Sequence, residues 1–364
     1  MGIVTAAERG GAVRIALIAP PWYTIPPSGY GGIEWVVALL ADGLSDRGHE
    51  VTLFAAPGSD TKARLVSPLA EAPPPEAIGD PWYEASHVVS VYEHCEEFDV
   101  LHDHTGPVGV SVGALSDCPT IHTLHGPFTQ QAHMLYSRVA RDHWFVAISE
   151  SQRSMAPENL RWGGVVYNGI PMSRYPFRED KDDYVFFLGR ADEEKAPHLA
   201  IEAARRAGRR LVMCATTKNE RERQYWAEHV EPILGDDVEV HGECPYEQKA
   251  DLLSRAAALA FPIQWPEPFG LVMTEAMACG TPVVAWRNGS VPEVVADGET
   301  GFIVSSVEEM AAAFDRVGDL DPQVMRAWVM ERFSDEAMIA GYERVYERVL
   351  QRERVYDRER HEAR

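Results

Sequence analysis

The feature that most constrains this chain is an apolar strand pattern that recurs with a helix pattern between its copies. Arg14–Pro20 has the composition of a buried strand, and a loop rich in Pro and Gly, Pro21–Gly32, follows it. The amphipathic segment Ile33–Asp46 ends before Gly48, and the next strand pattern is Glu50–Ala55. Parallel neighbours need such a crossover connection, so this order predicts a parallel α/β sheet.

The same alternation continues along the chain in two series. The first series has further predicted strands at Val100–His102, Thr120–His122 and Trp144–Ile148. The second series has predicted strands at Tyr184–Gly189, Arg210–Cys214, Val238–His241, Leu259–Pro262 and Pro282–Trp286. A chain of 364 residues exceeds one ordinary core and suits two domains. We therefore predict two Rossmann-like domains that face each other across a cleft, with ligand bound at the carboxyl ends of the strands.

The domain boundaries follow from composition. Residues 1–175 form the predicted N-terminal domain and residues 176–334 the predicted C-terminal domain, with the polar segment Pro171–Asp183 as the linker. Residues 335–364 form a predicted helix that is dense in Arg and Glu at i,i+4 spacing. Its apolar stripe needs a surface to pack against, and this stripe consists of Tyr342, Val345, Tyr346 and Val349.

Charge and composition exclude several classes of protein. The formal net charge is −22, which disfavours nucleic acid or an anionic membrane as the main partner. No apolar run approaches the roughly 20 residues of a membrane span, and Met1–Val13 contains no hydrophobic segment of a secretory signal. The five cysteines are dispersed without CxxC spacing, so we expect reduced, buried thiols in a cytoplasmic protein. Nothing in the sequence indicates the oligomeric state.

Two carboxylates eight positions apart suggest a ligand site. Leu271–Cys279 is predicted to be a helix that Gly280 and the following Thr and Pro terminate, so Glu267 precedes its N-terminus and Glu275 lies two turns along it. At 1.5 Å rise per residue the two are roughly 12 Å apart along the axis. The free N–H groups of the first turn between them form an anion site. A ligand with a central diphosphate and hydroxyls at both ends fits this spacing.

Two further loops follow predicted strands. Gly31 and Gly32 open the first helix, where glycine lets a ligand approach the backbone, although a flexible turn explains them equally well. Arg190 and Lys195 follow the first strand of the second domain and suit phosphate oxygens. We expect both side chains to be solvated at the mouth of the sheet. The alternative is a surface salt bridge with the neighbouring acids Asp192, Glu193 and Glu194.

Histidines follow two strands of the first domain. His125 adjoins Gly126 after a strand and is predicted to point into the cleft, whereas a lone histidine is more often structural. The sequence His102-Asp103-His104 suggests a metal, but no third ligand pattern accompanies it. We therefore expect no metal and no cofactor.

Together these residues resemble the large retaining glycosyltransferase family four, which has the GT-B fold. The family's Glu-seven residues-Glu signature matches Glu267 and Glu275, and its Gly-Arg…Lys element matches Gly189, Arg190 and Lys195. Its Gly-Gly loop and its His-Gly element match Gly31-Gly32 and His125-Gly126. Three further segments look familial: Ala147–Glu150, Val166–Ile170 and Gly289–Val295. The resemblance runs from about Val13 to the final helix.

The resemblance implies a role for each matched residue. Arg190 and Lys195 would neutralise the donor diphosphate, while Glu267 would bind the transferred sugar and Glu275 the ribose hydroxyls. His125 would contact the sugar near the bond that breaks. The remaining donor-binding positions are the backbone of Gly31, Gly32, Phe269, Gly270 and Leu271 and, beside the nucleobase, Gly242 to Tyr246. The final helix would cross back onto the first domain.

The predicted activity is metal-independent, retaining transfer of a hexosyl group from a nucleotide diphosphate sugar to an acceptor hydroxyl. A UDP-sugar is the preferred donor and GDP-mannose the second. The acceptor pocket is expected from the loops Pro21–Tyr30, Pro57–Asp80 and Gly126–Tyr136, and the acceptor stays open. Two alternatives remain: a phosphorylase or sugar-nucleotide epimerase on the same fold, and a non-catalytic nucleotide-sugar sensor.

Overall fold

The computed structural model describes residues 11–29, 31–139 and 143–362. The first ten residues and Tyr30, which belong to the predicted N-terminus and to the predicted acceptor loop, lie outside them. The chain forms two compact units. Unit 1 comprises the described residues up to Gly169 together with those from Asp335 onwards, and unit 2 is Ile170–Ser334.

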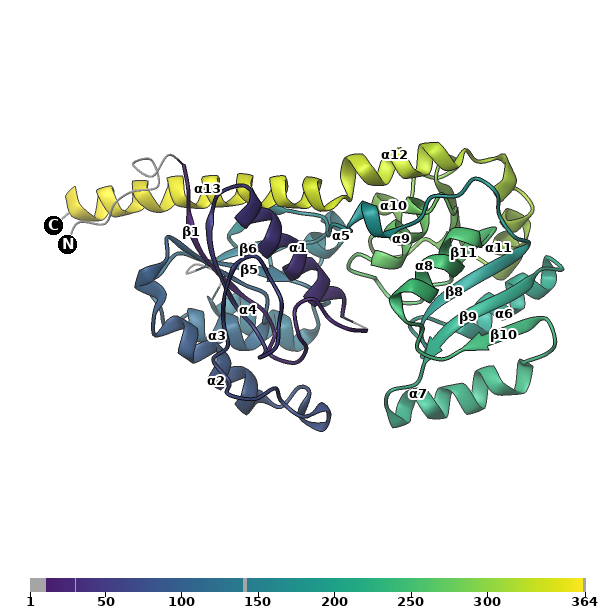
Figure 1. The fold of residues 1–364 in the computed structure, drawn as a ribbon, viewed down its shortest axis with the longest axis horizontal. Coiled ribbons are helices and arrows are strands. Elements are labelled where there is room, and N and C mark those ends of the chain that lie inside the picture. Colours follow the sequence, from purple (N-terminus) through teal and green to yellow (C-terminus); the bar gives the residue numbers. More distant parts are fainter. Residues whose placement is uncertain (1–10, 30, 140–142, 363–364) are drawn as a thin grey trace. The chain divides into compact units, whose positions relative to one another are not determined.

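Unit 1 is built on one parallel sheet with the strand order β3-β2-β1-β4-β5-β6-β7 (Figure 1). Its strands are β1 (Arg14–Ile18), β2 (Glu50–Phe54), β3 (Arg64–Val66), β4 (Val100–Asp103), β5 (Thr120–Leu124), β6 (Trp144–Ala147) and β7 (Trp162–Val165). Its helices are α1 (Gly32–Asp46), α2 (Pro81–Tyr92), α3 (Pro107–Gly113), α4 (Gln130–Val139), α5 (Glu150–Ser154) and α13 (Asp335–Glu362), with short 3₁₀ turns at Pro75–Ala77 and Cys95–Glu97.

Unit 2 repeats this plan with the parallel strand order β10-β9-β8-β11-β12-β13. Its strands are β8 (Tyr184–Arg190), β9 (Arg210–Thr216), β10 (Val238–His241), β11 (Ala258–Phe261), β12 (Val283–Trp286) and β13 (Gly301–Val304). Its α-helices are α6 (Pro197–Arg206), α7 (Glu220–Tyr225), α8 (Tyr246–Arg255), α9 (Leu271–Ala278), α10 (Val291–Val294), α11 (Val307–Phe314) and α12 (Pro322–Arg332). Short 3₁₀ turns at Met172–Arg174, Glu231–Ile233 and Val317–Asp319 and a π turn at Trp226–Val230 complete the unit.

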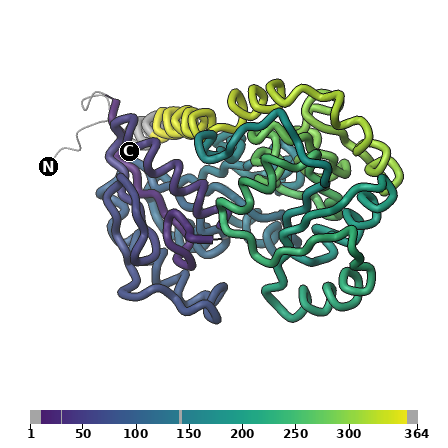
Figure 2. The backbone as a smooth tube through the Cα atoms, turned by 45° about the vertical axis from the view of Figure 1, so that its right-hand side comes forward, coloured from purple at the N-terminus to yellow at the C-terminus, as the bar shows by residue number. Residues whose placement is uncertain are grey.

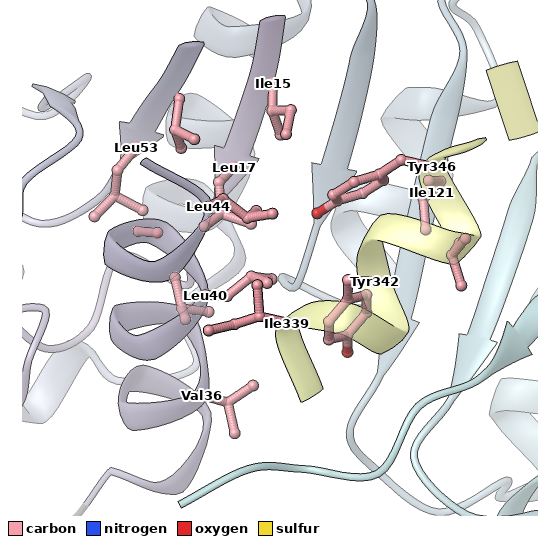
Figure 3. Packing of buried hydrophobic residues seen from close by; sticks show 14 of the residues in the cluster. Ile15, Leu17, Val36, Leu40, Leu44, Leu53, Ile121, Ile339, Tyr342 and Tyr346 are labelled. Atoms are coloured by element: carbon pink, nitrogen blue, oxygen red, sulfur yellow. The ribbon is translucent and has the colours of Figure 1, made fainter. Parts of the chain in front are cut away.

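The last helix completes the core of unit 1. Figure 2 shows the end of the chain, in yellow, returning beside the purple N-terminal segments of that unit. The predicted stripe on α13 is fully buried, and Ile339, Tyr342 and Tyr346 pack between α1 and the sheet (Figure 3). The apolar positions of α1 recur at helical spacing, so that Val36, Leu40 and Leu44 all face this cluster (Figure 3).

The α/β class with two parallel sheets is confirmed, and each predicted strand coincides with an observed one. The sequence did not predict β3, β7 or β13. β3 is a three-residue edge strand whose residues are largely exposed, and β7 contains Gly163 and Gly164, which lower strand propensity. Gly301 opens β13 after a turn, and so this short run lacks the apolar length of a central strand.

The predicted linker is wrong, because Pro171–Asp183 packs within unit 2. The hydroxyl of Tyr175 donates to Glu275, and Tyr175 is only 3% exposed. The ammonium of Lys181 donates to the carbonyls of Ser254 and Cys279 at 2.9 and 3.0 Å. The segment is polar in composition, as linkers are, but its polar side chains form hydrogen bonds within unit 2. Composition alone could not distinguish these two cases.

The prediction of reduced cysteines is also wrong for four of the five. Cys95 is bonded to Cys118, and Cys214 to Cys244, with Cα separations of 6.1 and 5.8 Å. The pairs are 23 and 30 residues apart in sequence, so dispersed spacing concealed partners that the fold brings together. Cys279 is the buried free thiol that was expected.

Candidate functional site

The predicted cations and carboxylates of unit 2 follow two adjacent strands at the centre of its sheet. β8 lies between β9 and β11, so the chain order reverses there. Arg190 ends β8 and Lys195 follows it, while Glu267 lies in the loop after β11. Open parallel sheets bind ligands at such a switch point, beyond the carboxyl ends of the strands.

Lys195 and Glu267 form an ion pair. The Lys195 ammonium lies 2.5 Å from the Glu267 Oε2 atom, and the side chains are 18% and 11% exposed. The ammonium also lies 5.6 Å from the ring centroids of Phe261 and Trp265, within cation–π range. The expected solvated position at the mouth of the sheet is therefore wrong for Lys195. Its positive charge is held in a largely enclosed position.

The loop that carries Lys195 has an unusual backbone. The Lys195 N–H donates to the Asp192 side chain at 2.8 Å, and Ala196 has a left-handed conformation with φ 49°. This conformation is uncommon for a residue other than glycine, and the fully buried Ala196 immediately precedes α6. The turn therefore fixes where the Lys195 side chain leaves the backbone.

Arg190 pairs with two of the acids that the alternative interpretation named and with one that it did not, Glu222, while Glu193 pairs with Arg221. Its guanidinium lies 3.1 Å from Asp192, 2.9 Å from Glu194 and 3.8 Å from Glu222. The Arg190 side chain is 36% exposed, more than that of Lys195. An anionic ligand would have to compete with these carboxylates for Arg190.

The loop before α9 is held by close backbone packing. Gly270 has φ 78° and precedes the helix, and Phe269 is buried. Gly289 approaches so closely that a Cβ atom there would lie 2.3 Å from the Glu267 amide nitrogen. The Ser290 N–H donates to the Glu267 carbonyl at 2.9 Å, and the Ser290 hydroxyl donates to the Phe269 carbonyl at 2.8 Å. The Gly-Ser pair, familial in the sequence but without an assigned role, thus positions Glu267.

The helix predicted after this loop is confirmed as α9, which begins at Leu271. Glu275 lies within it and is 8% exposed. One Glu275 oxygen, Oε1, accepts from the Tyr175 hydroxyl and from the Lys249 ammonium, each at 2.7 Å. Burial and the Glu275 charge raise the pKa of Tyr175 well above its usual value, so Tyr175 stays a donor. Sequence reasoning missed Tyr175 and Lys249, because neither belongs to a motif.

The predicted nucleobase position is a loop tied to the sheet. Gly242 is exposed directly after β10, and nothing lies within 4 Å of a Cβ atom built there. The Cys214–Cys244 disulfide joins this loop to β9. Tyr246, which opens α8, lies under the Arg174 guanidinium at 3.8 Å from the ring centroid.

The glycines of unit 1 lie at the start of α1. Gly31 precedes the helix, and a Cβ atom there would approach Pro27 and the Glu34 carboxylate to 2.8 Å. This close approach accounts for glycine at position 31. Gly32 is the first residue of α1, whose first-turn N–H groups are those of a potential anion site.

His125 follows β5 and is paired with a second histidine. Its Nε2 atom lies 2.8 Å from Nδ1 of the buried His104, and the two rings are stacked. Burial lowers the pKa of His125 to about 4 and that of His104 well below its usual value, so both rings are neutral at pH 7. His125 can therefore act through a hydrogen bond but not as a cation.

His102, two residues before His104, has a structural role. Its ring nitrogens lie 2.7 Å from the Tyr346 hydroxyl on α13 and 2.8 Å from the Thr123 hydroxyl on β5. In residues 11–29, 31–139 and 143–362 no group of three or more His, Cys, Asp or Glu side chains is arranged to hold a metal ion. Metal independence itself stays a prediction. No helix within those ranges has the length and apolar character needed to cross a bilayer.

Sequence comparison identifies both units. The pattern described as "Glycosyltransferase Family 4" matches residues 30–174, and that described as "Glycosyl transferases group 1" matches residues 173–327. A phosphatidyl-myo-inositol mannosyltransferase of Mycolicibacterium smegmatis is 27% identical over 93% of this chain and 94% of its own length. A glycogen synthase of Mycobacterium tuberculosis is 26% identical over 85% of this chain and 87% of its length.

Solved structures agree with these matches. A glycosyltransferase involved in avilamycin A biosynthesis superposes with a TM-score of 0.72 at 25% identity, covering 93% of this chain and 98% of its own. A sucrose-phosphate synthase of Thermosynechococcus elongatus shares the fold with a TM-score of 0.75 at 20% identity, covering 93% and 99%. The chain is thus an enzyme of glycosyltransferase family 4, the group 1 glycosyltransferases, and has the GT-B fold.

Proposed function

We propose that this enzyme is a retaining, metal-independent hexosyltransferase that uses a nucleotide diphosphate sugar, with a UDP-sugar first and GDP-mannose second. The observation that carries the proposal is the enclosed Lys195–Glu267 pair beside the N-terminus of α9. A fixed cation, a carboxylate and free backbone N–H groups together suit a diphosphate that is attached to a polyhydroxylated sugar.

The chemistry needs charge stabilisation more than a covalent partner. The bond between the anomeric carbon and the diphosphate oxygen breaks, and its electron pair leaves with the phosphate. The acceptor oxygen forms the new bond on the same face, and its proton passes to the released phosphate. Lys195 and Arg190 stabilise the charge that develops on the diphosphate, as preorganised electrostatic groups do. In this proposal Glu267 binds hydroxyls of the transferred sugar.

The other predicted contacts complete the proposal. Glu275 binds the ribose hydroxyls through Oε2, since Oε1 already accepts from Tyr175 and Lys249. The backbone of Phe269, Gly270 and Leu271 holds phosphate and sugar, and Gly242 flanks the base. In unit 1, neutral His125 contacts the sugar, and Gly31 and Gly32 admit the phosphate. The cytoplasmic location stays a proposal, and the two disulfides remove the reduced thiols from its support.

Relatives bear on the acceptor. Their names describe mannosyl transfer to phosphatidyl-myo-inositol, glycogen synthesis and glycosyl transfer to D-inositol 3-phosphate. From these names we infer that the acceptor group of this enzyme is a hydroxyl on a cyclic polyol or a sugar. A phosphorylase or an epimerase on the same fold is the competing activity.

The function is tested with a panel of nucleotides and donors. Stabilisation against heat by UDP, GDP, ADP and TDP, all in EDTA, identifies the base, and UDP is expected to give the largest shift. Transfer from the matching nucleotide sugar should then continue in EDTA and yield an α-product from an α-donor. Turnover that needs added Mg²⁺ or Mn²⁺ contradicts metal independence. Donor consumed only with inorganic phosphate, or isomerised without acceptor, identifies the competing activity.

The two glutamates should separate nucleotide binding from turnover. Glu275→Gln is expected to weaken UDP binding by about 2- to 10-fold, because one hydrogen bond to a neutral hydroxyl contributes about 0.5–1.5 kcal/mol. Glu267→Gln should bind UDP normally and lower kcat instead. Titration calorimetry and steady-state kinetics on both variants make the comparison, with melting temperature as the folding control. The reverse pattern means that the ligand lies the other way along α9.

A further inference from the structure

Unit 1 contains a pocket of about 500 Å³ beside His125. It lies where the strand order of this sheet reverses between β1 and β4, since Pro20 and Trp22 follow β1 and His104 follows β4. Its wall is mainly apolar and aromatic, formed by Trp22, Ile33, Leu124, Phe128, Leu135 and Tyr136. Two predicted acceptor loops contribute to it, but Pro57–Asp80 does not line it, because that segment follows β2 on the far side of β1.

Two carboxylates enter this pocket from different helices. Glu34 on α1 is 6% exposed, and Glu84 on α2 is half-buried. Among the described residues that line the pocket there is no Lys or Arg, and no described Lys or Arg forms an ion pair with Glu34 or Glu84. Within the described residues, the Glu34 carboxylate accepts a hydrogen bond from its own backbone N–H. A buried carboxylate without a cationic partner is costly, and burial accordingly raises the pKa of Glu34, so a positive ligand would stabilise its charged form.

The other titratable groups do not offset this negative charge. His104 and His125 are neutral at pH 7, because burial lowers both pKa values. Tyr136 also stays neutral, since burial raises its pKa to about 12. Burial and the charge of Asp103 raise the pKa of Glu84 to about 7, and an adjacent cation would lower it again. A phosphate bound beside Glu84 or Glu34 would meet a carboxylate and the apolar wall and no described Lys or Arg, whereas the donor phosphate proposed at Gly31 and Gly32 would meet the first-turn N–H groups of α1.

We propose that this pocket binds the acceptor, and that the acceptor is an amino-polyol, an aminosugar or aminocyclitol whose protonated amine pairs with one of the pocket's two carboxylates, Glu34 or Glu84, and which carries no phosphate. The inference rests on the proposed glycosyl transfer for the identity of the ligand as an acceptor. In this proposal the aromatic wall of the pocket packs against the ring of the acceptor, and the carboxylates favour an acceptor with a positive charge. A hydroxyl group can hydrogen-bond to a carboxylate but leaves its charge uncompensated, whereas an ammonium group also supplies the opposite charge, so the pocket should favour the amine.

Binding of three matched probes to the full chain tests the charge class without requiring turnover. The probes are an amino-deoxy-inositol, myo-inositol and inositol 3-phosphate, titrated by ligand-observed NMR in the absence of a donor. The amine is expected to bind about 10-fold or more tightly than myo-inositol, and the phosphate more weakly than either. Equal affinities, preference for the phosphate, or no binding of the amine would overturn the inference.

Variants locate the selection in the pocket. Either Glu34→Gln or Glu84→Gln, whichever removes the carboxylate that pairs with the amine, should remove most of the preference for the amine while leaving myo-inositol binding unchanged. The double variant should remove all of it. Glu93→Gln is the matched control, because Glu93 is exposed at the end of the same helix as Glu84. A preference that survives both pocket variants, each with a native melting temperature, would overturn the site.

The two proposals fail separately. Amine-selective binding that depends on Glu34 or Glu84, without transfer from any nucleotide sugar, would reject the proposed function and retain a cation-selective pocket. Transfer that proceeds only to neutral or phosphorylated acceptors would support the proposed function and reject the amino-polyol.

Discussion

Lys195→Met is expected to lower kcat by about 10²–10³-fold, the usual loss when one preorganised electrostatic group is removed from a reaction that develops charge. Its ammonium is largely enclosed and lies between Glu267 and the rings of Phe261 and Trp265. Such a cation acts in a medium where charge is weakly screened. The loss should appear in kcat as well as in donor affinity, because the charge on the diphosphate grows as the bond breaks.

The ion pair determines the controls for this variant. Removing Lys195 leaves a buried, unpaired Glu267 carboxylate, which destabilises the fold by itself. The double variant Lys195→Met with Glu267→Gln restores neutrality, so its melting temperature should recover although its kcat does not. Lys62→Met is the surface control, since Lys62 is 59% exposed in its pair with Asp46. Near-native kcat in a folded Lys195→Met protein would show that the pair is structural and that the diphosphate binds elsewhere.

Acidification from pH 7 to pH 5 is expected to lower the free energy of unfolding by about 2 kcal/mol or more. Burial lowers the pKa of His87 and His125 to about 4 and that of His102 to about 3, against about 6.5 in the unfolded chain. Between pH 6.5 and 4 the unfolded chain therefore binds more protons than the folded protein, and the free energy of unfolding decreases as the pH is lowered. Each such histidine contributes up to about 1.4 kcal/mol per pH unit.

Two acids oppose this loss in part. The raised pKa values of Glu84, about 7, and Asp103, about 6, make the folded state take up protons in the same range. The histidines prevail because the pKa values of His104 and His122 are lowered as well. Urea unfolding at several pH values measures the slope, which His102→Gln should reduce and His94→Gln, at an exposed histidine, should not. A flat profile would mean that the folded protein takes up as many protons as the unfolded chain over this range, and would contradict the lowered histidine pKa values.

Much of the fold follows from local pattern, whereas the partners of the site residues do not. The central strands are predictable because apolar runs fill both faces of a parallel sheet. β7 is not predictable, since its two glycines pack where Val345 of α13 leaves little room, a contact between residues far apart in sequence. In the same way Arg190 and Lys195 look equivalent in sequence, where both stand among acidic neighbours. Only the fold shows that Arg190 also approaches the distant Glu222 and that Lys195 pairs with the distant Glu267.

The position of α13 has a consequence for the order in which a newly made chain matures. Its aromatic residues belong to the same core as β1, and Tyr346 satisfies the buried His102. β1 is therefore synthesised long before α13, its partner in this core, whereas unit 2 is continuous and can fold as soon as Ser334 has emerged. Unit 1 can thus complete its core only after α13 has been synthesised. A prematurely terminated chain, lacking α13, would present an open core to chaperones and proteases rather than a partly active enzyme.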